Sequence, residues 1–347
     1  MLKHFGISGF ITLAAIFIAL FAMGINAAFT MIILIAIEVA FSFDNAIINA
    51  KVLARLSKFW QQLFLTVGML IAIVGMRFVF PILIVMITAD LSWSQVIDDA
   101  LNHPEVYGAH LAEAHAAIAA FGGAFLLTLT LFFFLDDNRP DLWLVRLERR
   151  LQRYGGRFWL PPLLTALGVL GLAAFAGHET ATVLQAGLFG VALYTGIKLM
   201  IDGLEHFAPK EQKIYSGWSA FLAFMYLEVL DASFSFDGVL GAFAITDKVL
   251  LIALGLGVGA IWVRSLTVFM VRHGTLSAYK YLEHGAHYAI LVLSVALLGS
   301  LYFEVPDAIT GIVGLGVIWA SYKSSKEAAR DKAKAKLKAW WLLSWRA

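Results

Sequence analysis

The chain has 347 residues, of which 61% are hydrophobic and 14% are charged, with a formal net charge of +2 and no cysteine. Soluble globular domains are about half apolar and about a quarter charged, so this composition excludes a fold that faces water on all sides. The lack of cysteine excludes disulfides, cysteine-ligated zinc, iron–sulfur clusters and thiol catalysis.

Apolar blocks of roughly 18 or more residues recur along the chain, and each is long enough to cross a hydrocarbon core of about 30 Å as a helix. We therefore predict an all-α polytopic membrane protein with about ten transmembrane helices. The first of them follows Lys3 and is expected to be retained rather than cleaved as a signal peptide. The predicted spans are 7–25, 27–50, 63–87, 116–135, 159–176, 180–202, 218–246, 249–272, 285–303 and 308–322.

Basic and acidic connections alternate between these spans. The connections after spans 2, 4, 6, 8 and 10 are basic, and those between them are acidic or nearly neutral. Because lysine and arginine accumulate in cytoplasmic connections, both termini are predicted to be cytoplasmic, in a bacterial inner (cytoplasmic) membrane. The basic residues are Lys51, Arg55, Lys58, Arg139, Arg146, Arg149, Arg150, Arg153, Arg157, Lys210, Lys213, Arg272, Lys280 and those of 323–338, and the acidic ones include Asp90, Asp98, Asp99, Glu105 and Glu113.

The spans divide the chain into a first membrane half (1–202), a cytoplasmic connection (203–217), a second membrane half (218–322) and a basic cytoplasmic tail (323–347). The basic stretches 139–157 and 323–338 are interpreted as anchors that face anionic lipid, not as a nucleic-acid surface. The lysine and alanine pattern of the tail, with its terminal tryptophans, predicts an amphipathic helix on the membrane surface.

One short motif occurs in each half. Residues 38–45 read Glu-Val-Ala-Phe-Ser-Phe-Asp-Asn, and residues 228–238 read Glu-Val-Leu-Asp-Ala-Ser-Phe-Ser-Phe-Asp-Gly. Alignment of the shared Ser-Phe-Asp sets Glu38 against Asp231 and Asp44 against Asp237. Since the two motifs lie in spans of opposite direction, they predict an inverted-topology repeat, which places substrate sites near the bilayer midplane.

Six side chains of these motifs are the candidate metal ligands: Glu38, Asp44, Asn45, Glu228, Asp231 and Asp237. A charge at mid-membrane costs about 2.5–3.5 kcal/mol or more, which favours an ion pathway over a purely structural role. On one straight helix Glu38 and Asp44 would point about 120° apart. A shared site therefore needs a break near residues 42–45, and a similar break near Gly238, or a position between helices.

Ligands of this kind, with oxygen as every donor, suit Mg²⁺, Ca²⁺ or Mn²⁺. Two arginines of the following spans, Arg77 and Arg264, are possible charge partners of the carboxylates. Structural ion pairs between the acids and these arginines are one alternative to a metal path, and proton relays without metal are the other.

The two motifs resemble the paired signatures of the TerC family of integral membrane proteins, and the length and ten spans look most like its DUF475 branch. That family is grouped with exporters of the LysE type and is associated with manganese efflux and, historically, with tellurite resistance. The resemblance implies that the motif carboxylates line a metal path. Gly238 stands where a polar residue is common in relatives, which removes one ligand from the second half.

We therefore expect a secondary transporter that exports a divalent metal ion, with Mn²⁺ (or Ca²⁺) as its substrate and no tightly bound cofactor. Proton exchange is the expected drive, because carboxylates must lose their protons to bind a metal. No enzyme motif is present, so we expect no enzyme. The alternatives are a membrane scaffold of a metal or tellurite stress complex and an exporter of Ca²⁺ or a small solute. The sequence does not determine the oligomeric state, and a homo-oligomer is one possibility.

Overall fold

The computed structural model describes the backbone of residues 2–79, 82–83, 85–86, 89–207, 214–243, 245–246, 248–274, 279–303, 305 and 307–344. Side chains are described in these ranges except at 2–4, 41, 76, 178, 201, 203–207, 230, 232–238, 240–241, 243, 307–308 and 331–344. Over this part of the chain the fold is all-helical, with fourteen α-helices, two π-helical stretches and one short 3-10 turn. The predicted all-α class is confirmed.

In chain order the helices are α1 (Leu2–Met23), α2 (Ile25–Phe41), α3 (Phe43–Leu53), α4 (Lys58–Leu63), η1 (Phe64–Gly68), η2 (Ile71–Val79), α6 (Trp93–Asn102), α7 (Pro104–Glu113), α8 (His115–Phe134), α9 (Val145–Gln152), α10 (Leu160–Ala173), η3 (Gly177–Glu179), α11 (Thr180–Phe207), α12 (Gly217–Phe243), α13 (Val249–His273), α15 (Leu282–Gly299) and α16 (Asp307–Ser344). Local sequence explains several ends. Ser92 and Gln95 form a capping box at the start of α6, Pro104 opens α7, and Gly274, with φ +58°, ends α13.

Six helices are long and apolar enough to cross a membrane, and the bent pair α2–α3 makes a seventh span if it is counted as one. The chain is thus an integral multi-pass membrane protein, with fewer clear spans among the described residues than the ten predicted. The other three predicted spans, 159–176, 218–246 and 308–322, coincide with α10, α12 and α16. Helix α10 is short, α12 carries carboxylates that shorten its apolar stretch, and α16 continues into charged sequence. The clear spans are Phe5–Met23, Lys58–Val79, His115–Phe134, Thr180–Met200, Val249–His273 and Leu282–Gly299.

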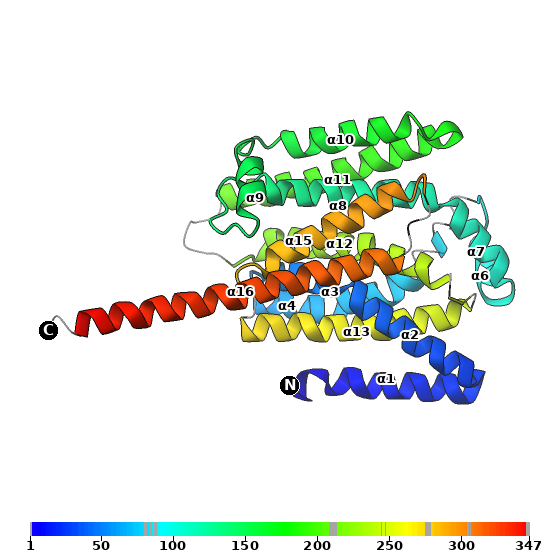
Figure 1. Cartoon of the computed structure of the whole chain (residues 1–347). Helices are drawn as coiled ribbons and strands as arrows, with labels where there is room; N and C mark the ends of the chain where they lie inside the picture. Colours follow the sequence, from blue (N-terminus) through cyan, green and yellow to red (C-terminus); the bar gives the residue numbers. More distant parts are fainter. Residues whose placement is uncertain are drawn as a thin grey trace.

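The C-terminal helix departs from the prediction of a span followed by a separate surface helix. Instead, α16 runs unbroken for 38 residues and extends beyond the rest of the bundle (Figure 1). Residues 323–344 contain no glycine or proline and are rich in alanine and lysine, which favour helix. In the same way, α11 continues to Phe207, inside the predicted connection 203–217.

The two ends of the bundle differ in charge. Figure 1 places α9 and the projecting part of α16 at one end and α6 and α7 at the other. The connection that contains α9 carries the six arginines of 139–157, whereas residues 90–113 carry five carboxylates and no lysine or arginine. We call these the basic end and the acidic end. Their separation is the pattern that the positive-inside rule describes.

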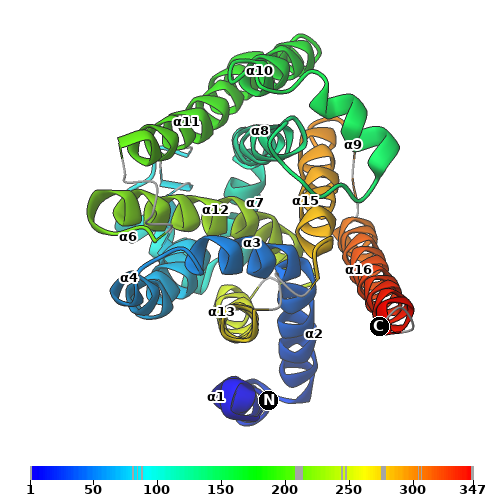
Figure 2. The same cartoon turned by 90° about the vertical axis from the view of Figure 1, so that its left-hand side faces the viewer.

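Glycines bring α13 close to its neighbours. A β-carbon on Gly255 would collide with Leu34 of α2, one on Gly259 would collide with Glu38, and one on Gly257 would press against η2. Small residues four apart are typical of close helix contacts in membranes. Figure 2 shows α13 between α1 and the pair formed by α3 and α12, and α13 contacts all three. The first motif is therefore packed against α13.

Candidate functional site

The first motif lies at a break between two helices. α2 ends at Phe41, Ser42 has the angles φ −91° and ψ 13°, and α3 begins at Phe43. The helices meet at a bend of 49°, so the predicted break near residues 42–45 is confirmed. The Ser42 amide still donates to the carbonyl of Glu38, at 2.9 Å. This bond holds the last turn of α2, which carries Glu38, next to the first turn of α3.

The second motif has no such break. α12 is one continuous helix through residues 228–238, so the prediction of a break near Gly238 is wrong. A glycine inside a helix costs about 1 kcal/mol. An unsatisfied backbone group in a membrane costs several kcal/mol, so Gly238 alone is not enough to break the helix.

The stretch Lys58–Val79 forms another wall, and it leaves α geometry in two π-helical parts, η1 and η2. π-Helical turns are rare in proteins overall, and those that occur are often at functional sites. A β-carbon on Gly68 would collide with the carboxylate of Glu228, so this glycine lets α12 approach η1. Met69, Ala72 and Arg77 follow it along the same wall.

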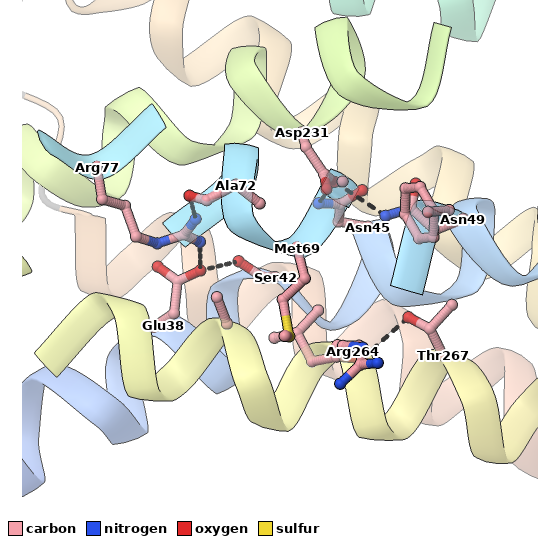
Figure 3. Close-up of a pocket in the computed structure, with 14 residues that line it drawn as sticks. Glu38, Ser42, Asn45, Asn49, Met69, Ala72, Arg77, Asp231, Arg264 and Thr267 are labelled. Atoms are coloured by element: carbon pink, nitrogen blue, oxygen red, sulfur yellow. Dashed lines mark hydrogen bonds and ion pairs between the residues drawn. The ribbon is translucent and has the colours of Figure 1, made fainter. Parts of the chain in front are cut away.

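These elements enclose a polar cavity of about 40 Å³, shown in Figure 3. One water needs about 10–15 Å³ by a comparable measure, so the cavity has room for an ion with a few of its ligands. The polar side chains that line it are Glu38, Ser42, Asn45, Asn49, Arg77, Asp231, Arg264 and Thr267. They come from α2, α3, η2, α12 and α13, which are distant in sequence.

Glu38 forms an ion pair with Arg77 on one side of this cavity (Figure 3). The guanidinium of Arg77 and the Ser42 hydroxyl, the latter at 2.9 Å, both donate to Oε1 of Glu38. Arg77 also donates to the carbonyl of Ala72, at 2.5 Å. Since both charged side chains are almost fully buried, each needs the other as its counter-charge.

Asp231 is the centre of a second cluster in the same cavity. The carboxamide nitrogens of Asn45 and Asn49 both donate to its Oδ1, at 2.5 and 2.9 Å. The carboxamide oxygens of Asn45 and Asn49 are buried and have no hydrogen-bond partner within the described part of the chain. Buried polar atoms are normally paired, so two free oxygen acceptors beside a carboxylate mark a place for a ligand.

Two other motif carboxylates, Asp44 and Glu228, do not line the cavity. Asp44 is buried and accepts the Asn45 amide at 2.8 Å. Glu228 is buried behind Gly68, and neither of its carboxylate oxygens has a hydrogen-bond partner among the described residues. Asp237 lies in α12, but its side chain is outside the described residues. Of the predicted ligands, Glu38, Asn45 and Asp231 are thus brought to one cavity.

Arg264 of α13 lines the same cavity, together with Thr267. The Nε of Arg264 is buried and has no hydrogen-bond partner in the part of the chain that the structure describes. Among the described side chains, two carboxylates and two guanidinium groups therefore face one space. Both arginines named from the sequence as charge partners lie there, and Arg77 is the one seen in an ion pair.

The donor set differs from that of a tight preformed metal centre. Over the described side chains, no three carboxylates or histidines lie together as metal ligands. The oxygens available instead come from two carboxylates, two carboxamides and two hydroxyls. Hard cations accept such mixed oxygen ligands and often keep part of their water.

The family described as "Protein of unknown function (DUF475)" matches residues 43–332, from the start of α3 into α16. This segment covers well over half of the chain. The chain belongs to the DUF475 family. No curated protein matches it, and no solved structure matches it. Most of the cavity of this DUF475 protein lies inside the matched segment, including Asn45, Asn49, Arg77 and Asp231, whereas Glu38 precedes it.

Two buried polar residues of the DUF475 chain, Asn49 and Glu148, are not predicted from the sequence. Asn49 follows Asn45 by four residues, and this helical spacing is the signal that places both on one face of α3. Glu148 gives no such signal, because it stands among arginines in a charged connection. Its side chain is nonetheless fully buried, 3.3 Å from both Arg139 and His284.

Proposed function

We propose that this DUF475 protein is a secondary transporter for a divalent cation, with Mn²⁺ as the first choice of substrate. The observation that carries the proposal is the pair of unpartnered carboxamide oxygens, of Asn45 and Asn49, beside the carboxylate of Asp231 in a buried cavity. A cation would satisfy these oxygens and offset the desolvation of the buried carboxylate.

Ligand chemistry supports a hard cation. The cavity offers oxygen donors, and the chain has no cysteine that would favour a soft metal. Carboxylate, carboxamide and hydroxyl oxygens, with water, are ligands that Mg²⁺, Ca²⁺ and Mn²⁺ accept. The small cavity and the absence of a fully acidic cage among the described residues fit weak binding and release, which transport needs.

Exchange of the charge partner of Glu38 is one step of the proposed transport cycle. In the conformation described, Arg77 neutralises Glu38. We propose that cargo replaces Arg77 as the partner of Glu38, so that a divalent ion meets two carboxylates, Glu38 and Asp231. Protons that bind these carboxylates would release the metal, because a protonated carboxyl is a poor metal ligand.

The proposal includes the relationship to TerC proteins and LysE-type exporters, ten spans, and an inverted repeat whose copies contain Glu38 and Asp231. It also places the basic end of the bundle in the cytoplasm. The paired motifs support the family relationship and the repeat. The helices at all ten predicted spans support the span count, and the arginines at one end support the orientation. Glu38 and Asp231 occupy equivalent positions of the two motifs and face one cavity.

One observation favours a second candidate function, export of a small solute that carries a carboxylate. Arg264 reaches the cavity with a buried Nε that has no hydrogen-bond partner among the described residues. A guanidinium without a full set of partners suits a carboxylate. In that case Arg264, rather than Asp231, would be the residue on which cargo binding depends.

The experiment that tests the proposal is Mn²⁺ flux into proteoliposomes that contain only this protein, with and without a pH gradient. Asp231→Asn is expected to abolish flux. The matched control is Asp98→Asn, the same change on exposed α6, which is expected to leave flux intact. Flux that persists in Asp231→Asn contradicts the site, and no flux from folded wild-type protein favours the scaffold or the solute exporter.

A further inference from the structure

The described residues that line the polar cavity include a single sulfur atom, that of Met69. Figure 3 shows the Met69 side chain extending from the wall formed by η1 and η2 toward α13, the helix that carries Arg264 and Thr267. We infer that the thioether of Met69 is a ligand of the bound cation and makes the cavity prefer Mn²⁺ to hard cations such as Ca²⁺ and Mg²⁺. The inference rests on the proposed function, because it concerns the same site.

The π-helical turn η1 sets the position of Met69. Its amide donates to the carbonyl of Phe64, five residues earlier, and this spacing defines a π turn. Compared with an α-helix, such a turn adds one residue, so each later side chain is rotated by about 100° around the helix axis. Met69 consequently lines the cavity, whereas the next residue, Leu70, is 61% exposed.

Among the described residues that this wall contributes to the cavity, Met69 alone offers a side-chain donor to a metal. These residues are Phe64, Gly68, Met69, Ala72 and Arg77. Hydrocarbon side chains have no lone pair, and a guanidinium donates hydrogen bonds but accepts none. The oxygen donors come from α2, α3, α12 and α13. A cation beside Asp231 would therefore meet sulfur on the side of η1 and η2.

The oxygen ligands by themselves do not separate the three candidate cations. Carboxylates, carboxamides and hydroxyls suit Mg²⁺, Ca²⁺ and Mn²⁺. A thioether is a soft ligand, which Mg²⁺ and Ca²⁺ bind poorly and transition-metal ions accept more readily. Mn²⁺ is the one transition-metal ion of the three. Sulfur in place of one oxygen ligand thus favours Mn²⁺, and it favours a softer ion such as Cd²⁺ still more.

A methionine can also serve only to fill space, because its flexible side chain adapts to irregular gaps. Met69→Leu separates the two roles, since this exchange conserves volume and is well tolerated in packed regions. It removes the sulfur and leaves an apolar side chain of similar size. Loss of a filler affects all bound cations alike, whereas loss of a ligand affects soft cations selectively.

The test measures Mn²⁺ binding to the purified full-length protein in detergent, with Cd²⁺ and Ca²⁺ as competitors. These two ions have the same charge and nearly the same radius, so they differ mainly in softness. We expect Cd²⁺ to displace Mn²⁺ from wild type far better than Ca²⁺ does. In Met69→Leu the ratio of the Ca²⁺ to the Cd²⁺ dissociation constant is expected to fall about tenfold, the equivalent of roughly 1.4 kcal/mol.

The matched control is Met31→Leu, the same change at a buried methionine of α2 that does not line the cavity. It is expected to keep the wild-type ratio. Saturable Mn²⁺ binding with a lower ratio in Met69→Leu alone supports a sulfur ligand. An unchanged ratio in Met69→Leu, or one lowered equally in Met31→Leu, overturns the role of Met69 and leaves the cation site intact. No Mn²⁺ binding by folded wild-type protein overturns both the site and this inference.

Discussion

Glu38 and Arg77 form an ion pair inside the helical bundle, with side-chain exposed fractions of only 3% and 6%. The two residues lie 39 positions apart and on different helices, so the pair joins the end of α2 to η2. Its burial has two consequences. The pair stabilises one conformation of the cavity, and it leaves Glu38 available to a competing cation whenever Arg77 moves away.

Breaking this pair from either side is expected to destabilise the protein. Arg77→Gln leaves a buried carboxylate without its counter-charge, which costs about 3–5 kcal/mol, and Glu38→Gln leaves a buried guanidinium. The double variant is expected to be less destabilised than the sum of the single variants, with a coupling of roughly 0.5–3 kcal/mol. Thermal unfolding in detergent measures the cycle, and strictly additive effects would contradict the pair.

Enlarging Gly259 is expected to disrupt the site through packing. A β-carbon at Gly259 would collide with the Cβ and Cγ of Glu38, so Gly259→Leu forces α13 away from α2 at a cost of about 1–3 kcal/mol. Gly316→Leu is the matched control, because nothing lies within 4 Å of a β-carbon there. The measurement is the melting temperature of each purified variant, and equal melting temperatures would rule out the close contact.

A cation site at Asp231 predicts that Asn49→Asp makes stability depend on metal. A second carboxylate 2.9 Å from the first, estimated from the Asn49–Asp231 hydrogen bond, is repelled in the absence of a cation and adds a ligand in its presence. We expect Mn²⁺ to raise the melting temperature of Asn49→Asp far more than that of wild type, since a ligand at 100 times its Kd stabilises by about 2.7 kcal/mol. The control is Asn26→Asp at the exposed start of α2, and an equal Mn²⁺ effect in both variants would count against the site.

The buried carboxylate of Glu148 predicts a pH dependence at the basic end. Burial alone raises the pKa of Glu148, but His284, the Leu144 amide and Arg139 stabilise its charged form and hold the pKa below its usual range. Such a group contributes stability above its unfolded pKa, about 4.3. The contribution disappears as the pH falls through the lower folded-state pKa.

Glu148→Gln is therefore expected to lower the melting temperature at pH 7, by the equivalent of about 3 kcal/mol. The difference from wild type should shrink as the pH falls below about 4. Glu105→Gln, an exposed glutamate of α7, is the control and should not differ from wild type at either pH. A difference that stays constant from pH 7 to pH 3 would show that ionisation of Glu148 does not matter.

The sequence predicts the class of the fold well, because apolar length and charge alternation directly reflect the bilayer. It also predicts the break at Ser42, from the roughly 120° that separates Glu38 and Asp44 on a straight helix, although Asp44 does not share the cavity with Glu38. It fails at Gly238, because the choice between a bent and a continuous helix depends on the surrounding packing. The predicted end of the last span at residue 322 is also wrong, because the alanine- and lysine-rich residues that follow favour helix and α16 continues through them to Ser344.

Within the candidate site, the sequence identifies Glu38, Asn45 and Asp231 through the repeated motif, and both arginines through their places in the spans that follow the two motifs. It does not reveal that Arg77 reaches Glu38 while Asp44 and Glu228 point elsewhere, because those directions depend on the π-helical stretches and on the contact at Gly68. Asn49 lies outside the motif, and its role emerges only when α12 brings Asp231 beside α3.

The most direct measurement is Mn²⁺ binding to the purified protein, followed by the loss of the electron paramagnetic resonance signal of free Mn²⁺. We predict saturable binding of one ion per chain that is lost in the double variant Glu38→Gln/Asp231→Asn. The control double variant Glu105→Gln/Asp98→Asn, in which both changes are on the exposed acidic end, should bind as wild type does. Undiminished binding by the Glu38→Gln/Asp231→Asn variant would contradict a cation site in this cavity.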